Sequence, residues 1–325
     1  MMFRIQAKQP ELTALMDRVL RQGRLGHAYI FEGEAGAGQA DLADYLAAAL
    51  FCQEADKPCG QCRNCRLVAQ GDLADLVHVK PEGQSLKIDQ MRELKQELSL
   101  TAMGGGQKVF IIHEAEKMTN SAANSLLKFL EEPNPEVYIF LLTSQKDRLL
   151  ATIQSRCQVI HFKSLPLDQV RLTYQEAGIS RHMSEYLAAL TSDLSLAQEL
   201  AEDEVFQDQT KRSWTWLEAL VKQDPRAFTM VQTDWIKQDK GRESNQRLLE
   251  LILAYLRDLL LFNYQETDQL ILPSRASGYQ DLRRQVNPRR LQSQVQLALK
   301  AQRMIQANVS PQAALEYFVL ASWQA

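Results

Sequence analysis

The chain has 325 residues, a length that usually divides into two or three domains because a single hydrophobic core stops growing before that size. Its apolar content is ordinary for a globular protein. Its formal net charge of −3 excludes the strongly basic surface of an autonomous DNA-binding domain. Any contact with nucleic acid is therefore expected to be local or shared with other chains.

The sequence contains no stretch that is typical of export or membrane insertion. The opening residues, Met-Met-Phe-Arg-Ile-Gln-Ala-Lys, lack the apolar region of a signal peptide. Charges such as Glu250, Arg257 and Asp258 interrupt the longest apolar runs. We therefore expect a cytoplasmic protein that makes no contact with a membrane.

From about Leu25 to Phe162 short β-like runs alternate with helix-like stretches, the pattern of an α/β fold with a parallel sheet covered by helices on both faces. None of the β-like runs alternates apolar with polar residues, which is typical of strands buried on both faces. The β-like runs are Ala28–Glu32, Leu76–Val79, Val109–Ile112 and Tyr138–Leu142. The helix-like stretches are Gly38–Phe51, Ile88–Leu98 and Ser121–Glu131, the last with Thr119 or Asn120 as its N-cap.

A glycine-rich loop follows the first β-like run and opens a helix, which is the context of a Walker A phosphate loop. Its glycines are Gly33, Gly36 and Gly38. The Lys that contacts the β- and γ-phosphates in such loops is replaced by Gln39, and the Ser or Thr that holds Mg²⁺ is replaced by Ala40. Losing a charge-assisted contact costs about 1.5–3 kcal/mol, so tight binding of Mg·ATP is not expected. Three glycines can also form merely a tight turn, and a second motif has to decide.

Four of the five cysteines lie within one short segment after this helix, with the spacing C-x6-C-x2-C-x2-C. They are Cys52, Cys59, Cys62 and Cys65. Four thiolates at this spacing can surround one tetrahedral Zn²⁺ and leave no ligand position open for catalysis, so we predict a structural zinc site. Gly60 eases the tight turn, and Lys57, Arg63 and Arg66 offset the negative charge. Unpaired cysteines, a disulfide pair and a zinc knuckle that touches nucleic acid are the alternatives.

The third β-like run has the form of a Walker B strand, with four apolar residues followed by His113 and Glu114. The Asp that orders Mg²⁺ is replaced by His113, while Glu114 stands where a water-activating Glu belongs. Because Mg²⁺ prefers oxygen ligands, an imidazole does not replace that carboxylate. Two separate motifs have lost the same function, which favours a phosphate loop without hydrolysis.

Several separated motifs together resemble the delta-prime clamp-loader subunits, which are related to the bacterial tau/gamma motor subunits. The motifs are Gly26–Gly33, Ile88–Arg92, Lys117–Thr119 with Asn124–Pro133, and Thr152–Cys157 with its Ser-Arg-Cys signature. They extend from about residue 22 to residue 163. They are specific only in combination, because glycine loops and apolar strands recur in unrelated nucleotide-binding folds. Asn308–Pro311 also resembles the start of the family's final helix, which is a weaker match.

The resemblance implies three domains. Residues 1–165 become an AAA-type P-loop domain, with a zinc module at about 52–65 inserted after the P-loop helix. Residues 166–203, which the sequence divides into two or three short helices, become a small helical lid domain, and residues 204–325 become an all-α collar domain for oligomerisation. Arg247–Tyr264 is apolar nearly all round and is predicted to be the central helix of the collar.

The resemblance also implies a role for Arg156, which lies between Ser155 and Cys157. In the family, this residue is an arginine finger that acts in trans on the ATP site of the adjacent motor subunit, and its two neighbours position it. Such a finger is worth about 10³–10⁵ in rate, or about 4–7 kcal/mol of barrier. The alternative is an ordinary surface Arg that pairs with a carboxylate.

Three hypotheses follow for the function. In the first, which we favour because it accounts for every substitution, the chain is a non-hydrolysing stator of the DNA polymerase III clamp loader. It works with the tau/gamma and delta subunits to load the sliding clamp onto primed DNA, and it contains structural Zn²⁺ but no functional ATP or Mg²⁺. In the second it is an active AAA-type ATPase despite Gln39, Ala40 and His113. In the third it is a zinc-dependent nucleic-acid-binding module, for which salt-dependent DNA binding by the isolated chain would be evidence.

Overall fold

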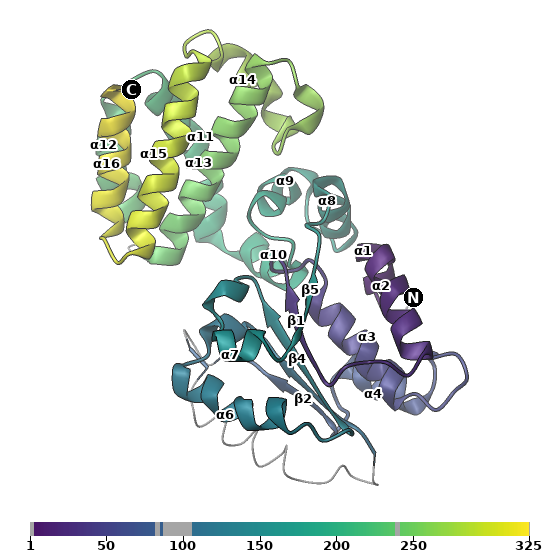
Figure 1. The fold of residues 1–325 in the computed structure, drawn as a ribbon. Coiled ribbons are helices and arrows are strands. Elements are labelled where there is room, and N and C mark those ends of the chain that lie inside the picture. Colours follow the sequence, from purple (N-terminus) through teal and green to yellow (C-terminus); the bar gives the residue numbers. More distant parts are fainter. Residues whose placement is uncertain (1–2, 82–84, 87–105, 238–240, 325) are drawn as a thin grey trace. The chain divides into compact units, whose positions relative to one another are not determined.

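The computed structural model describes residues 3–81, 85–86, 106–237 and 241–324 of the chain. Contacts within the chain divide it into two compact units, Met1–Leu165 and Pro166–Ala325 (Figure 1). Residues 166–203 and 204–325 fall together in the second unit, so their separate roles as lid and collar stay a prediction. The helix predicted at Ile88–Leu98 lies outside the described residues.

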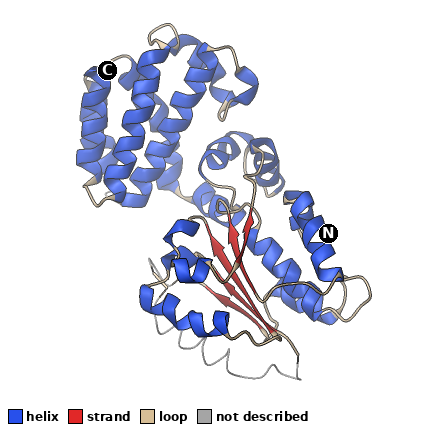
Figure 2. Cartoon of the chain, viewed as in Figure 1, coloured by secondary structure: helices blue, strands red, loops and turns tan. Residues whose placement is uncertain are grey.

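The first unit is built around a five-stranded sheet with the order β2-β3-β4-β1-β5, drawn as red arrows in Figure 2. All paired strands are parallel. The strands are β1 (Ala28–Glu32), β2 (Leu76–Val79), β3 (Lys108–Ile112), β4 (Val137–Thr143) and β5 (Gln158–His161). Because β4 lies between β1 and β3, the loops that follow β1 and β3 flank its carboxyl end, the edge at which ligands bind in open α/β sheets.

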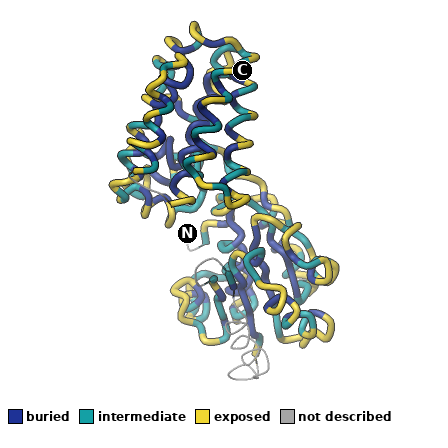
Figure 3. The backbone as a smooth tube through the Cα atoms, turned by 90° about the vertical axis from the view of Figure 1, so that its left-hand side faces the viewer, coloured by how far each residue is buried: buried dark blue, intermediate teal, exposed yellow. Residues whose placement is uncertain are grey.

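The four predicted strands are confirmed, each with bounds within one residue of the expected ones at either end. The inner strands β1, β3 and β4 are buried over most of their length, whereas the edge strands β2 and β5 are partly exposed. In Figure 3 the dark blue of buried residues follows these inner strands. β5 was not predicted, because its central Val159 and Ile160 are flanked by the exposed residues Gln158 and His161. Two apolar residues are too few to mark a strand.

Helices cover both faces of this sheet (Figures 1 and 2). On one face lie α1 (Ile5–Lys8), α2 (Pro10–Arg21), α3 (Gln39–Phe51) and α4 (Arg63–Gln70), and on the other lie α6 (Asn120–Glu131) and α7 (Ala151–Gln154). Alternate residues of β1 separate the two cores, since Phe31 packs under α3 while Ile30 packs under α6. The N-cap of α6 is Thr119, as expected, and its hydroxyl accepts a hydrogen bond from the backbone N–H of Ala122.

The second unit is entirely helical within its described residues. It begins with three short helices, α8 (Leu167–Glu176), α9 (Arg181–Leu190) and α10 (Leu194–Glu202). The longer segment that follows contains α11 (Glu204–Val221), α12 (Arg226–Met230), α13 (Arg242–Asn263), α14 (Ala276–Leu282), α15 (Pro288–Gln306) and α16 (Pro311–Gln324). α13 packs against α9, α11, α14 and α15, which confirms the predicted central helix. Buried side chains cover more than half of its circumference, while Glu250 and Leu253 are half-buried and Arg257 is exposed. None of the described helices is both long and apolar enough to span a lipid bilayer.

A buried carboxylate fixes the loop that follows α13. Asp258 has no exposed surface, and it accepts hydrogen bonds from the backbone N–H groups of Ile271 (2.8 Å) and Leu272 (2.7 Å). The hydroxyl of Tyr279 donates a third bond at 3.2 Å. Because a buried carboxylate is tolerated only when its oxygens are paired, this network is a structural tie within the helical unit.

Candidate functional site

The glycine loop lies at the carboxyl end of β1 and leads directly into α3, as the Walker A pattern predicts. Gly36 and Gly38 have φ angles of 86° and 111°, which favour glycine over residues with a side chain. At Gly33 an added Cβ atom would lie 2.7 Å from the Cβ atom of Phe162, so the backbone passes too close for a larger residue. The loop therefore keeps the backbone form of a phosphate cradle.

Gln39 closes this loop from within. Its side chain is buried, and its Nε2 donates a hydrogen bond of 2.9 Å to the carbonyl oxygen of Glu34 in the same loop. The side chain that replaces the phosphate-binding Lys thus binds backbone instead of presenting a charge. Ala40, the next residue, has no hydroxyl that could hold Mg²⁺.

The N-terminal segment lies against the outside of the loop. The Lys8 ammonium is 2.7 Å from a carboxylate oxygen of Asp41, and the Gln9 side-chain amide donates to the carbonyl oxygen of Ala37 at 3.0 Å. Ile5 is fully buried, and its Cδ1 would be 2.9 Å from a Cβ atom added at Gly38. These contacts hold the loop from the N-terminal segment. No motif in the sequence indicated them.

His113, which directly follows β3, belongs to a chain of three polar side chains. Its Nε2 is 3.1 Å from Nδ1 of His78 on β2, and Nε2 of His78 is 3.4 Å from a carboxylate oxygen of Asp44 on α3. His78 thus faces two partners with its two ring nitrogens, so the three groups do not converge on one metal ion. The chain Asp44–His78–His113 instead links the P-loop helix to the Walker B strand.

Burial sets the protonation states of His113 and Asp44. It lowers the pKa of His113 to about 4, with smaller contributions from the charges of His78 and Lys80. It raises the pKa of Asp44 to about 7, and the nearby Asp41 adds to that rise. At neutral pH His113 is therefore a neutral imidazole, which does not substitute for the carboxylate that orders Mg²⁺.

Glu114 is exposed, and its backbone is left-handed with a φ of 47°. Its carboxylate lies 2.5 Å from the ammonium of Lys117, three residues later in the same turn. The one acidic group that remains of the Walker B pattern is thus neutralised by its own chain.

The depressed pKa of His113 predicts a pH-dependent stability. Because the unfolded chain holds the His113 proton up to pH 6.5 and the folded chain only up to about 4, the stabilisation is complete above 6.5 and is lost as the pH falls through this interval. In His113→Asn we expect the loss on acidification to be smaller than in the native chain by about 1–2 kcal/mol, less than the full shift implies, because the site is partly exposed. Urea unfolding at several pH values measures this difference.

The matched control for this prediction is His182→Asn, which removes an imidazole in α9 of the helical unit. The opposite dependence of Asp44, whose raised pKa stabilises the fold at lower pH, is shared by all three proteins. If His113→Asn and His182→Asn show the same pH profile, the assignment to His113 is wrong.

The four predicted zinc ligands come together between α3 and α4. Their Sγ atoms all lie within 4.8 Å of one another, with 3.9 Å between Cys59 and Cys65 and 4.0 Å between Cys62 and Cys52. Four sulfurs at about 2.3 Å from a tetrahedral Zn²⁺ would be about 3.8 Å apart, so the group has the right size for this ion. The four cysteines can therefore hold one metal ion.

Backbone N–H groups point at the sulfurs, as in a thiolate metal site. The N–H of Cys62 lies 3.3 Å from Sγ of Cys59, and that of Cys65 lies 3.5 Å from Sγ of Cys62. Hydrogen bonds from Gln61 and Cys62 lower the pKa of the Cys59 thiol to about 7. Gly60, with a φ of 71°, forms the expected tight turn. The basic side chains predicted to offset the thiolate charge, Lys57, Arg63 and Arg66, are exposed in this segment.

Removing one of these sulfurs should remove the metal. We expect Cys59→Ser to copurify with much less zinc than the native chain, because three thiolates close a structural site incompletely. Metal analysis of the purified proteins measures this content. Cys157→Ser is the control and should keep one zinc per chain; equal zinc in both variants would contradict the site.

Arg156 lies in the turn between α7 and β5 and is held by its own chain. Its Nη2 is 2.8 Å from Oε1 of Glu131, the last residue of α6. Its Nη1 donates to the carbonyl oxygen of Thr152 at 2.9 Å and to Oγ of Ser155 at 3.3 Å. The side chain remains 34% exposed, so the guanidinium is ordered and still accessible at the surface.

The two neighbours of Arg156 have different environments. Ser155 ends α7, and its hydroxyl donates to the carbonyl oxygen of Thr152 at 3.2 Å. Cys157 packs against the core under α6, and burial raises the pKa of its thiol to about 12. This thiol is therefore protonated and unreactive at neutral pH, and its contribution is packing.

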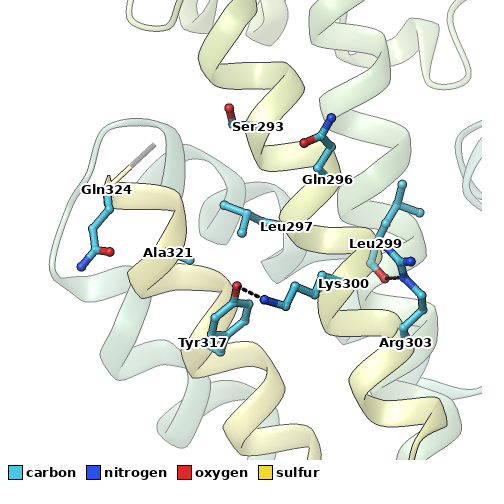
Figure 4. Close-up of a pocket in the computed structure, with 9 residues that line it drawn as sticks. All are labelled: Ser293, Gln296, Leu297, Leu299, Lys300, Arg303, Tyr317, Ala321 and Gln324. Carbon is cyan, nitrogen blue, oxygen red and sulfur yellow. Dashed lines mark hydrogen bonds between the residues drawn. The ribbon is translucent and has the colours of Figure 1, made fainter.

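The helical unit carries a surface groove of about 680 Å³ between α15 and α16 (Figure 4). Figure 4 shows Tyr317 of α16 turned toward Lys300 of α15, whose ammonium donates to the Tyr317 hydroxyl at 2.8 Å. The side chains that line it are Ser293, Gln296, Leu297, Leu299, Lys300, Arg303, Tyr317, Ala321 and Gln324. The groove thus combines apolar area with cationic groups, and the sequence did not indicate it.

Comparison with known proteins relates the chain to one family. The family model described as DNA polymerase III, delta subunit, matches residues 8–166. DNA polymerase III subunit delta' of Bacillus subtilis is 36% identical over 320 residues, 96% of this chain and 95% of that protein. The delta' subunit of Escherichia coli is 37% identical over 172 residues, 52% of this chain and 51% of its own. The tau subunit of Escherichia coli is 35% identical over 181 residues, 55% of this chain and 28% of its own. The chain belongs to the family of DNA polymerase III delta' subunits.

Proposed function

We propose that this chain is a non-hydrolysing stator of the DNA polymerase III clamp loader and that it supplies Arg156 to the ATP site of a neighbouring tau/gamma subunit. The observation that carries the proposal is the position of Arg156 relative to its own phosphate loop. Gln158, two residues after Arg156, pairs with Tyr29 of β1, and the loop begins four residues beyond Tyr29 at Gly33. At about 3.3 Å per residue, the loop starts at least about 13 Å further along the sheet.

Arg156 therefore lies at the amino edge of the sheet, whereas the glycine loop lies at the carboxyl edge. A guanidinium at this place does not reach its own loop, and it is accessible to another molecule. Its planar, permanently charged fork suits the oxygens of a phosphoryl group, which favours a role in trans.

The glycine loop supports the proposal that this chain does not hydrolyse ATP itself. Gln39 binds the loop backbone, His113 is neutral, and Glu114 is paired with Lys117. A Walker-type site holds Mg·ATP with a lysine at the place of Gln39, a hydroxyl at the place of Ala40 and a carboxylate at the place of His113, and this chain has none of the three. The contacts of Lys8 and Gln9 further hold the loop from the N-terminal segment.

The proposed partners are the tau/gamma motor subunits and the delta subunit, together with the sliding clamp and primed DNA in the assembled loader. The relatives named delta' and tau support a place in this assembly. In this proposal residues 1–165 are the AAA-type domain, 166–203 the lid and 204–325 the collar, and the cysteine cluster holds a structural Zn²⁺.

The isolated chain should not bind Mg·ATP stoichiometrically. With no lysine, metal hydroxyl or Walker B aspartate, we expect an affinity at least about a hundredfold weaker than that of the tau subunit, which serves as the positive control. Equilibrium dialysis with labelled ATP measures this ratio. Stoichiometric binding at the concentrations that saturate tau, or turnover at its rate, would refute the stator.

Arg156→Ala should leave the loader assembled and lower its ATPase rate when the clamp and primed DNA are present. An arginine finger raises the rate of hydrolysis about 10³–10⁵-fold at the ATP site it serves. That site should therefore stop hydrolysing ATP, while the other sites of the loader continue. Arg156→Lys keeps the charge but lacks the fork and should lose much of the same activity.

Arg148→Ala is the matched control for the Arg156 variants, because Arg148 is an exposed arginine in the turn before α7. Assembly is checked by gel filtration and ATP turnover by phosphate release. An ATPase rate in Arg156→Ala that matches the native loader would exclude the finger.

A further inference from the structure

The Arg156 finger meets a carboxylate in its own chain. Glu131 ends α6, and its Oε1 lies 2.8 Å from Nη2 of Arg156. The two side chains are 48% and 34% exposed, so the pair lies at the surface and is open to water and to an incoming group. The next residue, Glu132, is also exposed but makes no ion pair with Arg156.

The two terminal nitrogens of the guanidinium have different partners. Nη1 binds neutral groups only, the Thr152 carbonyl at 2.9 Å and the Ser155 hydroxyl at 3.3 Å. Nη2 binds the one charged partner that the described residues offer. The contacts on Nη1 orient the side chain from α7 and are compatible with a second anion. A phosphoryl oxygen that binds Nη2 would have to displace this carboxylate, whose negative charge would oppose it.

The strength of such a pair suits a contact that opens during each reaction cycle. An exposed ion pair shifts an equilibrium by only about 1.4- to 5-fold. A phosphoryl group carries more negative charge than a carboxylate and can bind the fork through two oxygens, so it displaces the carboxylate readily. A phosphoryl group can therefore displace Glu131 from Arg156, and the effect of removing Glu131 is still large enough to measure.

We propose that Glu131 is a positioning residue that holds Arg156 against α6 until the phosphate of the neighbouring subunit's ATP takes its place. Glu131 then competes with that ATP for the finger. This inference rests on the proposed role of Arg156 and adds the group that restrains it between reaction cycles.

The test is Glu131→Gln in the reconstituted loader with motor subunits, delta, clamp and primed DNA. Gln keeps the length of the side chain and its acceptor oxygen but removes the charge. We expect the ATP concentration for half-maximal turnover to fall by about 1.4- to 5-fold, with a smaller change in the maximal rate. Glu132→Gln removes a neighbouring exposed charge and should behave as the native loader does.

Ionic strength separates this role from a merely structural one. Because salt screens an exposed pair, the native loader and Glu131→Gln should converge as salt is raised, whereas an effect of altered packing would persist. Thermal unfolding of the two proteins checks that the fold is unchanged.

The double variant Arg156→Ala/Glu131→Gln should match Arg156→Ala alone, because a restraint has no effect without the group it restrains. If Arg156→Ala lowers the rate while Glu131→Gln gives the same half-saturation as Glu132→Gln, or a higher one, the restraint is refuted and the finger stands. If Arg156→Ala leaves the rate unchanged, the finger is refuted and the restraint with it.

Discussion

The parallel register of β1 with β4 and β5 is the constraint on which the rest of the first unit depends. Because all the paired strands run in one direction, the loops after β1 and β3 meet at one edge of the sheet, and the ends of α6 and α7 meet at the other. The glycine loop and His113 therefore lie at the carboxyl edge, and Arg156 with Glu131 lies at the amino edge. The same sheet separates the glycine loop from the guanidinium that we propose acts on a neighbouring subunit's ATP.

At the carboxyl edge, Gln39, Ala40 and His113 stand where the Walker patterns have charged or hydroxyl groups, and side chains of the same unit hold the loop. A buried polar group needs a partner, and several of those at this edge find one inside the chain. Gln39 binds Glu34, Lys8 binds Asp41, and His113 is neutral beside His78. The N-terminal segment contributes to these contacts through Lys8 and Gln9.

The P-loop helix α3 connects this edge with the cysteine cluster. Gly38 precedes the first residue of α3, and Cys52 directly follows its last residue. Asn64 of α4 adds a hydrogen bond of 2.8 Å to the carbonyl oxygen of Phe51 at the end of α3. A metal held by the four sulfurs would thus fix the far end of the helix whose near end carries the glycine loop. This gives a metal at the cysteine cluster a structural place at the end of α3.

The amino-acid sequence by itself determined the features that depend on neighbouring residues. Strands buried on both faces show as unbroken apolar runs, the cysteine spacing fits a tetrahedral ion, and the hydroxyl of Thr119 begins α6. Only the tertiary structure decided the partners of the site residues. His78 contacts His113 across 35 positions, and Glu131 contacts Arg156 although β4 and α7 lie between them in the chain. Such pairs follow from strand order and register, which bring distant residues together, and no local pattern in the sequence records them.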